Sequence, residues 1–291
     1  MDYMLSEHVQ KIILGLQRDE ITEHIVYRKL AEKSKGKNAE ILKTISNDEL
    51  LHYNKWKKYT QAEVNPDEIS VSKYLIFSVI FGLMFVMKIM ERGEEEAQEA
   101  YNRISAELSE AKELLQDEIK HEKFLIDMID EKRLDYVGSI VQGLNDALVG
   151  LMGQLAGFTL ALQNTQLIGF AGLIAGIAQF LSNSTSEIEI YFSQRTEENK
   201  ETLKASVYSG LVYISTVVIL LMPYFLSTNY YVTLLVTLLT TSLIIVFFTF
   251  YISVVKTLPL RKMFLTMILA TLGVSGASFV IGWIVKVALK L

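Results

Sequence analysis

The chain has 291 residues, of which 51% are hydrophobic, a formal net charge of -5 and no cysteine. The missing cysteines exclude disulfides, thiolate metal sites and redox dithiols, so any metal chemistry must rest on carboxylates and imidazoles. No basic face of the kind that binds nucleic acid is visible, and the opening "MDYMLSEHVQ" lacks the pattern of a secretory signal.

The charged residues are concentrated in the first part of the chain. Residues 1–133 hold 26 of the 33 Asp and Glu, 20 of the 28 Lys and Arg, and all four His. The remainder is apolar and almost free of charge. We therefore expect two domains, a polar one over 1–133 and a membrane domain over 134–291.

The polar part has the apolar periodicity of helices throughout. Breaks occur at "KSKGKN" (33–38) and "EVNPDE" (63–68). The pattern predicts a four-helix bundle, with helices over 5–33, 38–62, 71–103 and 106–131. The apolar run at 74–87 is too short to cross a bilayer and is expected to be a buried helix segment or one that lies along the membrane surface.

Two of these helices carry the same Glu-x-x-His pattern. Glu49 and His52 lie in "DELLHYNKW", and Glu118 and His121 lie in "DEIKHEKF". Residues three apart share one face of a helix, so each pair projects together. Such pairs are typical metal ligands, although a charged, solvated helix face would give the same spacing.

The other two helices share a second spacing. Glu20 stands seven residues before Tyr27, and Glu94 stands seven residues before Tyr101. One Glu from each of two helices and Glu-x-x-His from each of the other two is the ligand inventory of di-iron and di-manganese carboxylate bundles. The sequence therefore predicts a di-metal site for Fe or Mn. Nearby carboxylates leave alternative ligands open, namely Glu23, Glu95 and Glu96.

The second part contains apolar runs long enough to cross a bilayer, which takes about 20 residues. They predict five membrane spans, at 139–163, 167–190, 205–226, 230–255 and 263–288. Lysines and arginines gather before the first span and in alternate connections. By the positive-inside rule the polar domain is then cytoplasmic and the C-terminus outside. Small residues are expected to allow close helix packing, at Gly153, Gly157, Gly172, Gly176, Gly273 and Gly276.

Carboxylates within the spans indicate an ion pathway. "VQGLNDALVG" places Asp146 in the first span, and "SNSTSEIEIY" places Glu187 in the second. A charged side chain inside a bilayer costs about 2.5–3.5 kcal/mol on insertion scales, so it usually serves ions or protons. The alternative is that Asp146 reaches water at the end of its helix.

With its two Glu-x-x-His pairs and its two Glu-to-Tyr spacings, the polar part resembles a ferritin-like domain of the rubrerythrin type, over about residues 5–131. It differs in having no Cys-rich electron-transfer module and in having Ala97 where a further Glu is common. The resemblance implies a di-iron site. Whether that site would oxidise iron stays open.

"GLNDALVG", "SQR" at 193–195 and "LGVSGASFVIGWIV" resemble the vacuolar iron transporter family. That resemblance implies a dimeric exchanger of Fe2+ or Mn2+ for protons, with Asp146 and Glu187 on the route. The family commonly has Met where this chain has Asn183. The two halves in this order resemble the membrane-bound ferritin-like proteins of prokaryotes.

These expectations combine into one hypothesis: an iron exporter of the cell membrane that works as a homodimer and receives metal in a cytoplasmic di-metal domain. The alternative is a membrane-anchored di-iron oxidase or peroxidase whose spans only tether it.

Overall fold

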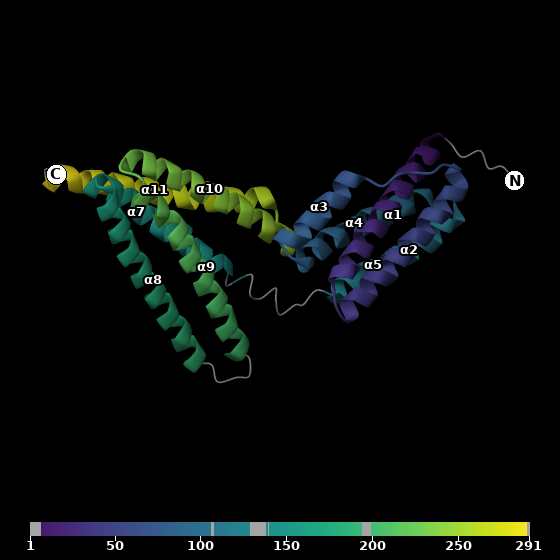
Figure 1. The fold of residues 1–291 in the computed structure, drawn as a ribbon, viewed down its shortest axis with the longest axis horizontal. Helices are drawn as coiled ribbons and strands as arrows, with labels where there is room; N and C mark the ends of the chain where they lie inside the picture. Colours follow the sequence, from purple (N-terminus) through teal and green to yellow (C-terminus); the bar gives the residue numbers. More distant parts are fainter. Residues whose placement is uncertain (1–6, 106–107, 129–137, 139, 194–198, 290–291) are drawn as a thin grey trace. The chain divides into compact units, whose positions relative to one another are not determined.

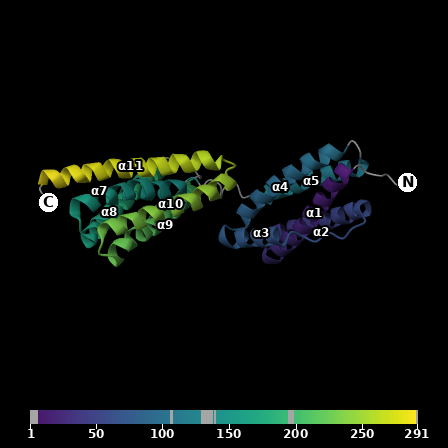
Figure 2. The same ribbon diagram turned by 90° about the horizontal axis from the view of Figure 1, so that it is seen from above.

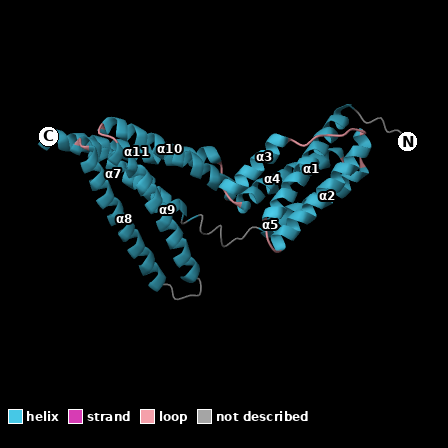
Figure 3. Cartoon of the chain, viewed as in Figure 1, coloured by secondary structure: helices cyan, strands magenta, loops and turns pink. Residues whose placement is uncertain are grey.

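The computed structural model describes residues 7–105, 108–128, 138, 140–193 and 199–289, without the side chains of 187–193, 199–205 and 289. Within these ranges the chain consists of helices and the loops that join them (Figure 3). The all-helical class predicted from the sequence is confirmed for this part of the chain. The chain divides into two compact units, Met1–Asp130 and Glu131–Leu291, which are described separately below.

Unit 1 contains five described helices, labelled in Figure 1. Helix α1 packs most extensively against α2, and α4 packs most extensively against α5. The two pairs meet through contacts of α1 with α4 and of α2 with α5. The helices are α1 (Glu7–Lys33), α2 (Lys37–Thr60), α3 (Glu68–Ile80), α4 (Leu83–Ile104) and α5 (Ser109–Met128).

The single helix expected over 71–103 is wrong, because the structure has two helices there. Gly82 separates α3 from α4 with φ 86° and ψ 168°, a conformation that only glycine adopts without strain. The start of α3 is fixed by Asp67, whose side chain accepts hydrogen bonds from the backbone N–H groups of Ile69 and Ser70. The apolar run at 74–87 therefore bends around Gly82.

Two apolar clusters pack unit 1. One surrounds Trp56 and Tyr101 and includes Ile13 and Leu114. The other surrounds Tyr27 and continues to the opposite end of the unit. Apolar burial of about 25 cal/mol per Å² offsets the cost of the charged groups enclosed between the clusters.

Within its described residues, unit 2 contains four helices that are long and apolar enough to cross a membrane, by length and composition. These candidate spans are Thr165–Ser186, Ser206–Leu226, Tyr230–Val255 and Leu260–Ala288. They belong to α8 (Thr165–Ser193), α9 (Asn199–Leu226), α10 (Tyr230–Val255) and α11 (Leu260–Leu289). Among these helices α8 packs along α9 and α10 packs along α11, and Figure 1 shows the two pairs at an angle to each other.

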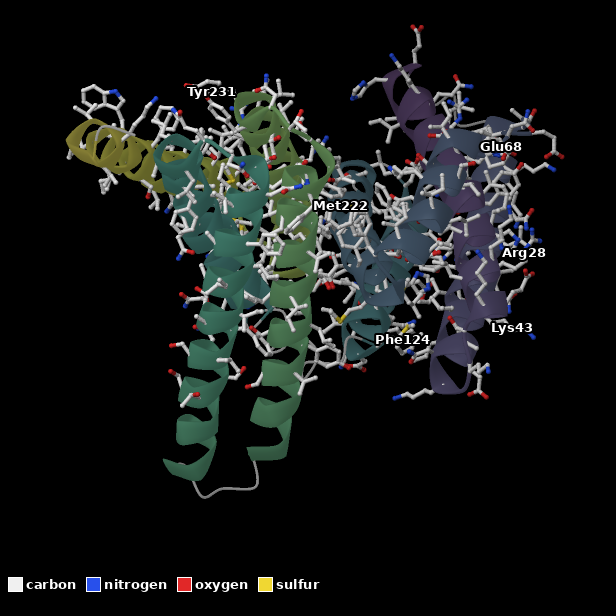
Figure 4. All side chains as sticks on the ribbon, turned by 60° about the vertical axis from the view of Figure 1, so that its left-hand side comes forward. Arg28, Lys43, Glu68, Phe124, Met222 and Tyr231 are labelled. Atoms are coloured by element: carbon white, nitrogen blue, oxygen red, sulfur yellow. The ribbon has the colours of Figure 1, made fainter. Side chains whose placement is uncertain are left out.

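The outer surface of unit 2 is apolar. Met222 and Tyr231, labelled in Figure 4, are 59% and 53% exposed. In unit 1 the labelled Arg28 and Lys43 are charged instead. Apolar side chains on the outside of long helices belong to an integral membrane protein, whose solvent is the hydrocarbon of the bilayer.

The first of the five predicted spans is not among the four candidates. Residues 140–162 are helical without a gap, but Asp146–Leu151 form a π-helical segment ahead of α7 (Met152–Leu162). A π-helical turn inserts an extra residue and often marks a functional position. Here it begins at Asp146.

Glycines allow α7 and α11 to pack closely. A Cβ at Gly282 would overlap the backbone of Gly157, and a Cβ at Gly153 would overlap Val274. Gly273 and Gly276 face open space within the described part of unit 2, so close packing at these two positions stays a prediction. Gly172 and Gly176 do face neighbouring side chains, as expected.

Candidate functional site

Four helices of unit 1 bring the six predicted ligand residues into one buried cluster. None is more than 3% exposed. Glu20 comes from α1 and Glu94 from α4, while α2 and α5 each supply a Glu-x-x-His pair. The members are Glu20, Glu49, His52, Glu94, Glu118 and His121. We call them the Glu/His cluster.

The Glu/His cluster contains two groups of atoms suited to holding a metal ion. Within each group one ligand atom per residue lies within 4.8 Å of the others. One group is Glu20, Glu49, His52 and Glu118, and the other is Glu49, Glu94, Glu118 and His121. Because both groups contain Glu49 and Glu118, these two carboxylates could serve two neighbouring cations at once.

The imidazoles face the carboxylates through Nδ1. His121 Nδ1 lies 2.9 Å from Glu49 Oε1, and His52 Nδ1 lies 3.2 Å from Glu118 Oε1 and 3.3 Å from Glu20 Oε2. Ligands about 2.1 Å from one octahedral cation are about 3 Å apart. The observed spacings therefore match the edges of a coordination shell.

Buried polar atoms without hydrogen bonds also support a metal site in the Glu/His cluster. Seven such atoms in the Glu/His cluster have no hydrogen-bond partner within the described residues, and they are Glu20 Oε2, Glu49 Oε1 and Oε2, His52 Nδ1, Glu94 Oε2, Glu118 Oε2 and His121 Nδ1. A buried polar atom left unpaired costs about 1–3 kcal/mol. A bound cation would pair these atoms, so the residues present fit a metal site.

Glu20 and Glu94 each belong to only one of the two groups, and we call them the outer carboxylates. Each is bound by a tyrosine of another helix. Tyr27 of α1 donates to Glu94 Oε1 at 2.6 Å, and Tyr101 of α4 donates to Glu20 Oε1. Each hydrogen bond uses one carboxylate oxygen. The other oxygen, Oε2, remains turned into the cluster.

Two aspartates that the sequence reasoning missed orient the imidazoles. His121 Nε2 lies 3.3 Å from Asp48 Oδ2, and His52 Nε2 lies 3.5 Å from Asp117 Oδ2. A carboxylate at the outer nitrogen fixes the ring orientation of a metal-binding histidine. The signal was present in the sequence, because both motifs read Asp-Glu-x-x-His.

The charges of the Glu/His cluster depend on one another. Burial raises the pKa of Glu20 and Glu94 well above the usual value, and neighbouring carboxylates raise it further. Burial alone would lower the pKa of His121, but Glu118 and Glu49 beside it raise that pKa to about 11. This many buried carboxylates require positive charge, which protons or metal cations can supply.

The three alternative ligands lie outside both groups. Glu95 and Glu96 are exposed on α4. Glu23 is partly buried, and its pKa is raised by burial and by Glu49 and Glu20. Glu23 therefore lies close enough to influence the cluster's charge but is not one of the atoms gathered in it.

An aromatic pair closes one side of the cluster. Trp56 Nε1 donates to the Tyr101 hydroxyl at 3.3 Å, and the two rings stack 5.7 Å apart. Trp56 is fully buried. It therefore holds the ring of Tyr101 in the position from which Tyr101 reaches Glu20.

In unit 2 the predicted transport residue Asp146 has polar neighbours. Asn183 Nδ2 donates to Asp146 Oδ2 at 2.8 Å, and Gln179 Nε2 donates to Asn183 Oδ1 at 2.9 Å. A cavity of about 450 Å³ lies beside them, lined by Asn145, Asp146, Val149, Gly150, Gln179, Thr266, Met267 and Ala270. The other predicted residue, Glu187, lies in α8, and its side chain is outside the described part of the structure.

Together these features define an all-helical integral membrane protein with a buried Glu/His cluster that could hold metal. No known protein family, curated protein or solved structure matches the chain.

Proposed function

We propose that the chain exports Fe2+, and also Mn2+, from the cytoplasm in exchange for protons. In this proposal unit 1 is a cytoplasmic, ferritin-like receiving domain that binds two metal ions. Unit 2 is a transporter domain with five spans, the four apolar helices and the π-interrupted helix that contains Asp146. The active form is a homodimer with its C-terminus outside.

The observation that carries the proposal is the sharing of Glu49 and Glu118 between two groups of ligand atoms. A single structural ion would need only one group. Oxygen and imidazole ligands in this number suit Fe or Mn, and the chain has no thiolate to favour a softer metal.

The ligand residues of unit 1 would form two sites, one for each ion. His52 and Glu20 would hold one ion and His121 and Glu94 the other, and Glu49 and Glu118 would be available to both. Asp48 and Asp117 hold the imidazoles in place from outside. If unit 1 also acts as a ferroxidase, iron held there would supply the electrons that reduce O2.

Asp146 supports transport rather than simple anchoring. Its carboxylate lies beside a cavity and accepts a hydrogen bond from the Asn183 amide, and no ion pair of Asp146 is found among the described residues. A membrane anchor has no use for a carboxylate in a helix that crosses the bilayer. An exchanger does, because one carboxylate can bind a divalent cation or a proton in turn.

The deciding experiment is metal flux into proteoliposomes that contain the full chain, with a proton-sensitive dye inside. We expect Fe2+ uptake coupled to proton movement, and loss of both with Asp146→Ala while unit 1 keeps its metal. Thr185→Ala is a matched control, since Thr185 is exposed on α8 and bonds only its own helix. Metal binding with no flux in the unmutated chain would favour the membrane-anchored oxidase instead.

A further inference from the structure

Two helix–helix turns and the end of α5 lie together at one end of the bundle in unit 1. The apolar cluster around Tyr27 contains Leu30 near the end of α1, Phe77 of α3, Leu83 at the start of α4 and Met128 at the end of α5. Figures 1 and 2 both show the α1–α2 turn, the α3–α4 turn and the end of α5 at this end. We call it the exit end, because the chain leaves unit 1 here.

The exit end carries an exposed apolar stripe on α3. Ile76, Val79 and Ile80 are 53%, 75% and 56% exposed and lie on one face of the last turns of α3. The opposite side of α3 is packed, with Val71 only 2% exposed. Isolated apolar side chains on a surface are normal, but a continuous stripe at helical spacing indicates a contact surface.

Exposed lysines that take part in no ion pair among the described residues lie beside this stripe. A cavity of about 250 Å³ opens between the α1–α2 turn and α3, lined by Leu30, Lys33, Lys35, Asn38, Val79 and Leu83 among others, with no acidic residue in its lining. Lys33, Lys35 and Lys37 are exposed, and none of the ion pairs within the described residues involves them. Apolar side chains next to unpaired ammonium groups suit the surface of an anionic bilayer.

The position of these features in the chain identifies the occupant. α5 ends at Met128, and the membrane unit begins three residues later, at Glu131. The polypeptide therefore runs from the exit end to the membrane spans. Because the linking segment is short, lipid is available to this end. A second copy of the chain is a poorer partner, because a two-fold contact centred here would place the lysines against their own equivalents.

We propose that the exit end of unit 1 binds anionic phospholipid at the bilayer surface. Val79, Ile80 and Ile76 enter the interface between headgroups and acyl chains. Lys33 and Lys35 bind lipid phosphate at the mouth of the cavity. The contact holds the Glu/His cluster near the membrane, and it does not depend on whether the chain transports iron.

The absence of native cysteine allows a direct test with the full chain in lipid nanodiscs. A spin label at Val79→Cys reports accessibility to dissolved oxygen and to a water-soluble nickel chelate. The matched control is Asn102→Cys, exposed near the other end of α4. In nanodiscs with phosphatidylglycerol we expect the label at 79 to be protected from the chelate and open to oxygen, and the label at 102 to behave as in water.

Charge reversal tests the lysines. With Lys33→Glu and Lys35→Glu together we expect the protection at 79 to disappear, because each lysine adds about fivefold to the preference for an anionic surface. Nanodiscs of phosphatidylcholine alone should give the same loss. Retained metal binding and helical content would show that the variant is folded.

Three results would overturn the proposal. Equal chelate access at 79 and 102 in anionic nanodiscs would show that the exit end is in water. Loss of protection on adding inorganic phosphate would show that a free anion, not a lipid, is the ligand. Spin–spin broadening at 79 that vanishes on mixing with unlabelled chain would assign the stripe to a second copy.

Discussion

Tyr27 of α1 donates a hydrogen bond to Glu94 of α4 across the bundle, with 2.6 Å between the oxygens. The bond ties one outer carboxylate of the Glu/His cluster to a different helix. Both partners are buried, at 0% and 1% exposure, so water cannot replace the hydroxyl. The orientation of Glu94 is therefore set by the packing of two helices that are distant in sequence.

Tyr27→Phe should lower the free energy of unfolding of unit 1 by about 1–3 kcal/mol, since it removes the donor to a buried carboxylate oxygen. Chemical denaturation of the metal-free protein measures the change. Tyr53→Phe is the control, because its hydroxyl donates to the exposed Glu63 and accepts from the backbone N–H of the partly exposed Val64, and water can reach both groups. Equal effects for the two variants would contradict the role given to the Tyr27 bond.

The shared carboxylates should matter more for metal content than the outer ones. Glu49→Ala should reduce the bound metal from two ions to none per chain, whereas Glu20→Ala should leave one, because Glu49 belongs to both ligand groups and Glu20 to one. Elemental analysis of the purified protein measures the ratio. Glu95→Ala, at an exposed position on α4, should keep both ions. Identical losses in the first two variants would rule out sharing.

Removing metal should destabilise unit 1. A ligand that binds only the folded state at 100 times its dissociation constant adds about 2.7 kcal/mol per site. Thermal unfolding of the full chain with and without a chelator should therefore show a lower midpoint in the chelator. The Glu49→Ala variant should show no such shift. A chelator-independent midpoint in the unmutated chain would mean that the Glu/His cluster is filled by protons alone.

Gly282→Ala should loosen the contact between α7 and α11, because its new methyl group would overlap the Gly157 backbone, which cannot move aside. Overpacking of this kind costs about 1–3 kcal/mol. Thermal denaturation in detergent measures the effect. Gly276→Ala, on the same helix but facing open space, should change stability little. A larger loss for Gly276→Ala would place the contact on the other face of α11.

Asn183→Ala should slow metal flux about tenfold to a hundredfold if Asp146 lies on the route, because a hydrogen bond to a charged group contributes about 1.5–3 kcal/mol. The proteoliposome assay measures the rate. Ser186→Ala, which loses only a bond within α8, should keep the original rate. An unchanged rate for Asn183→Ala would remove the amide from the mechanism.

The sequence alone predicted the all-helical class and the residues that gather in the Glu/His cluster. It did so because the spacing in Glu-x-x-His and the length of an apolar run are local properties, decided by helix geometry and bilayer thickness. It did not predict the break at Gly82, since glycine permits a turn without requiring one. It counted five spans, of which the described residues supply four by length and composition.

Only the tertiary structure decided which side chains meet. Tyr27 pairs with Glu94 and Asp48 with His121, in each case across two helices far apart in sequence. The crossing of helices also decided that Gly282, not Gly276, faces a neighbour. The helical period determines the face on which a residue lies, but the partner of that face depends on how the whole core packs.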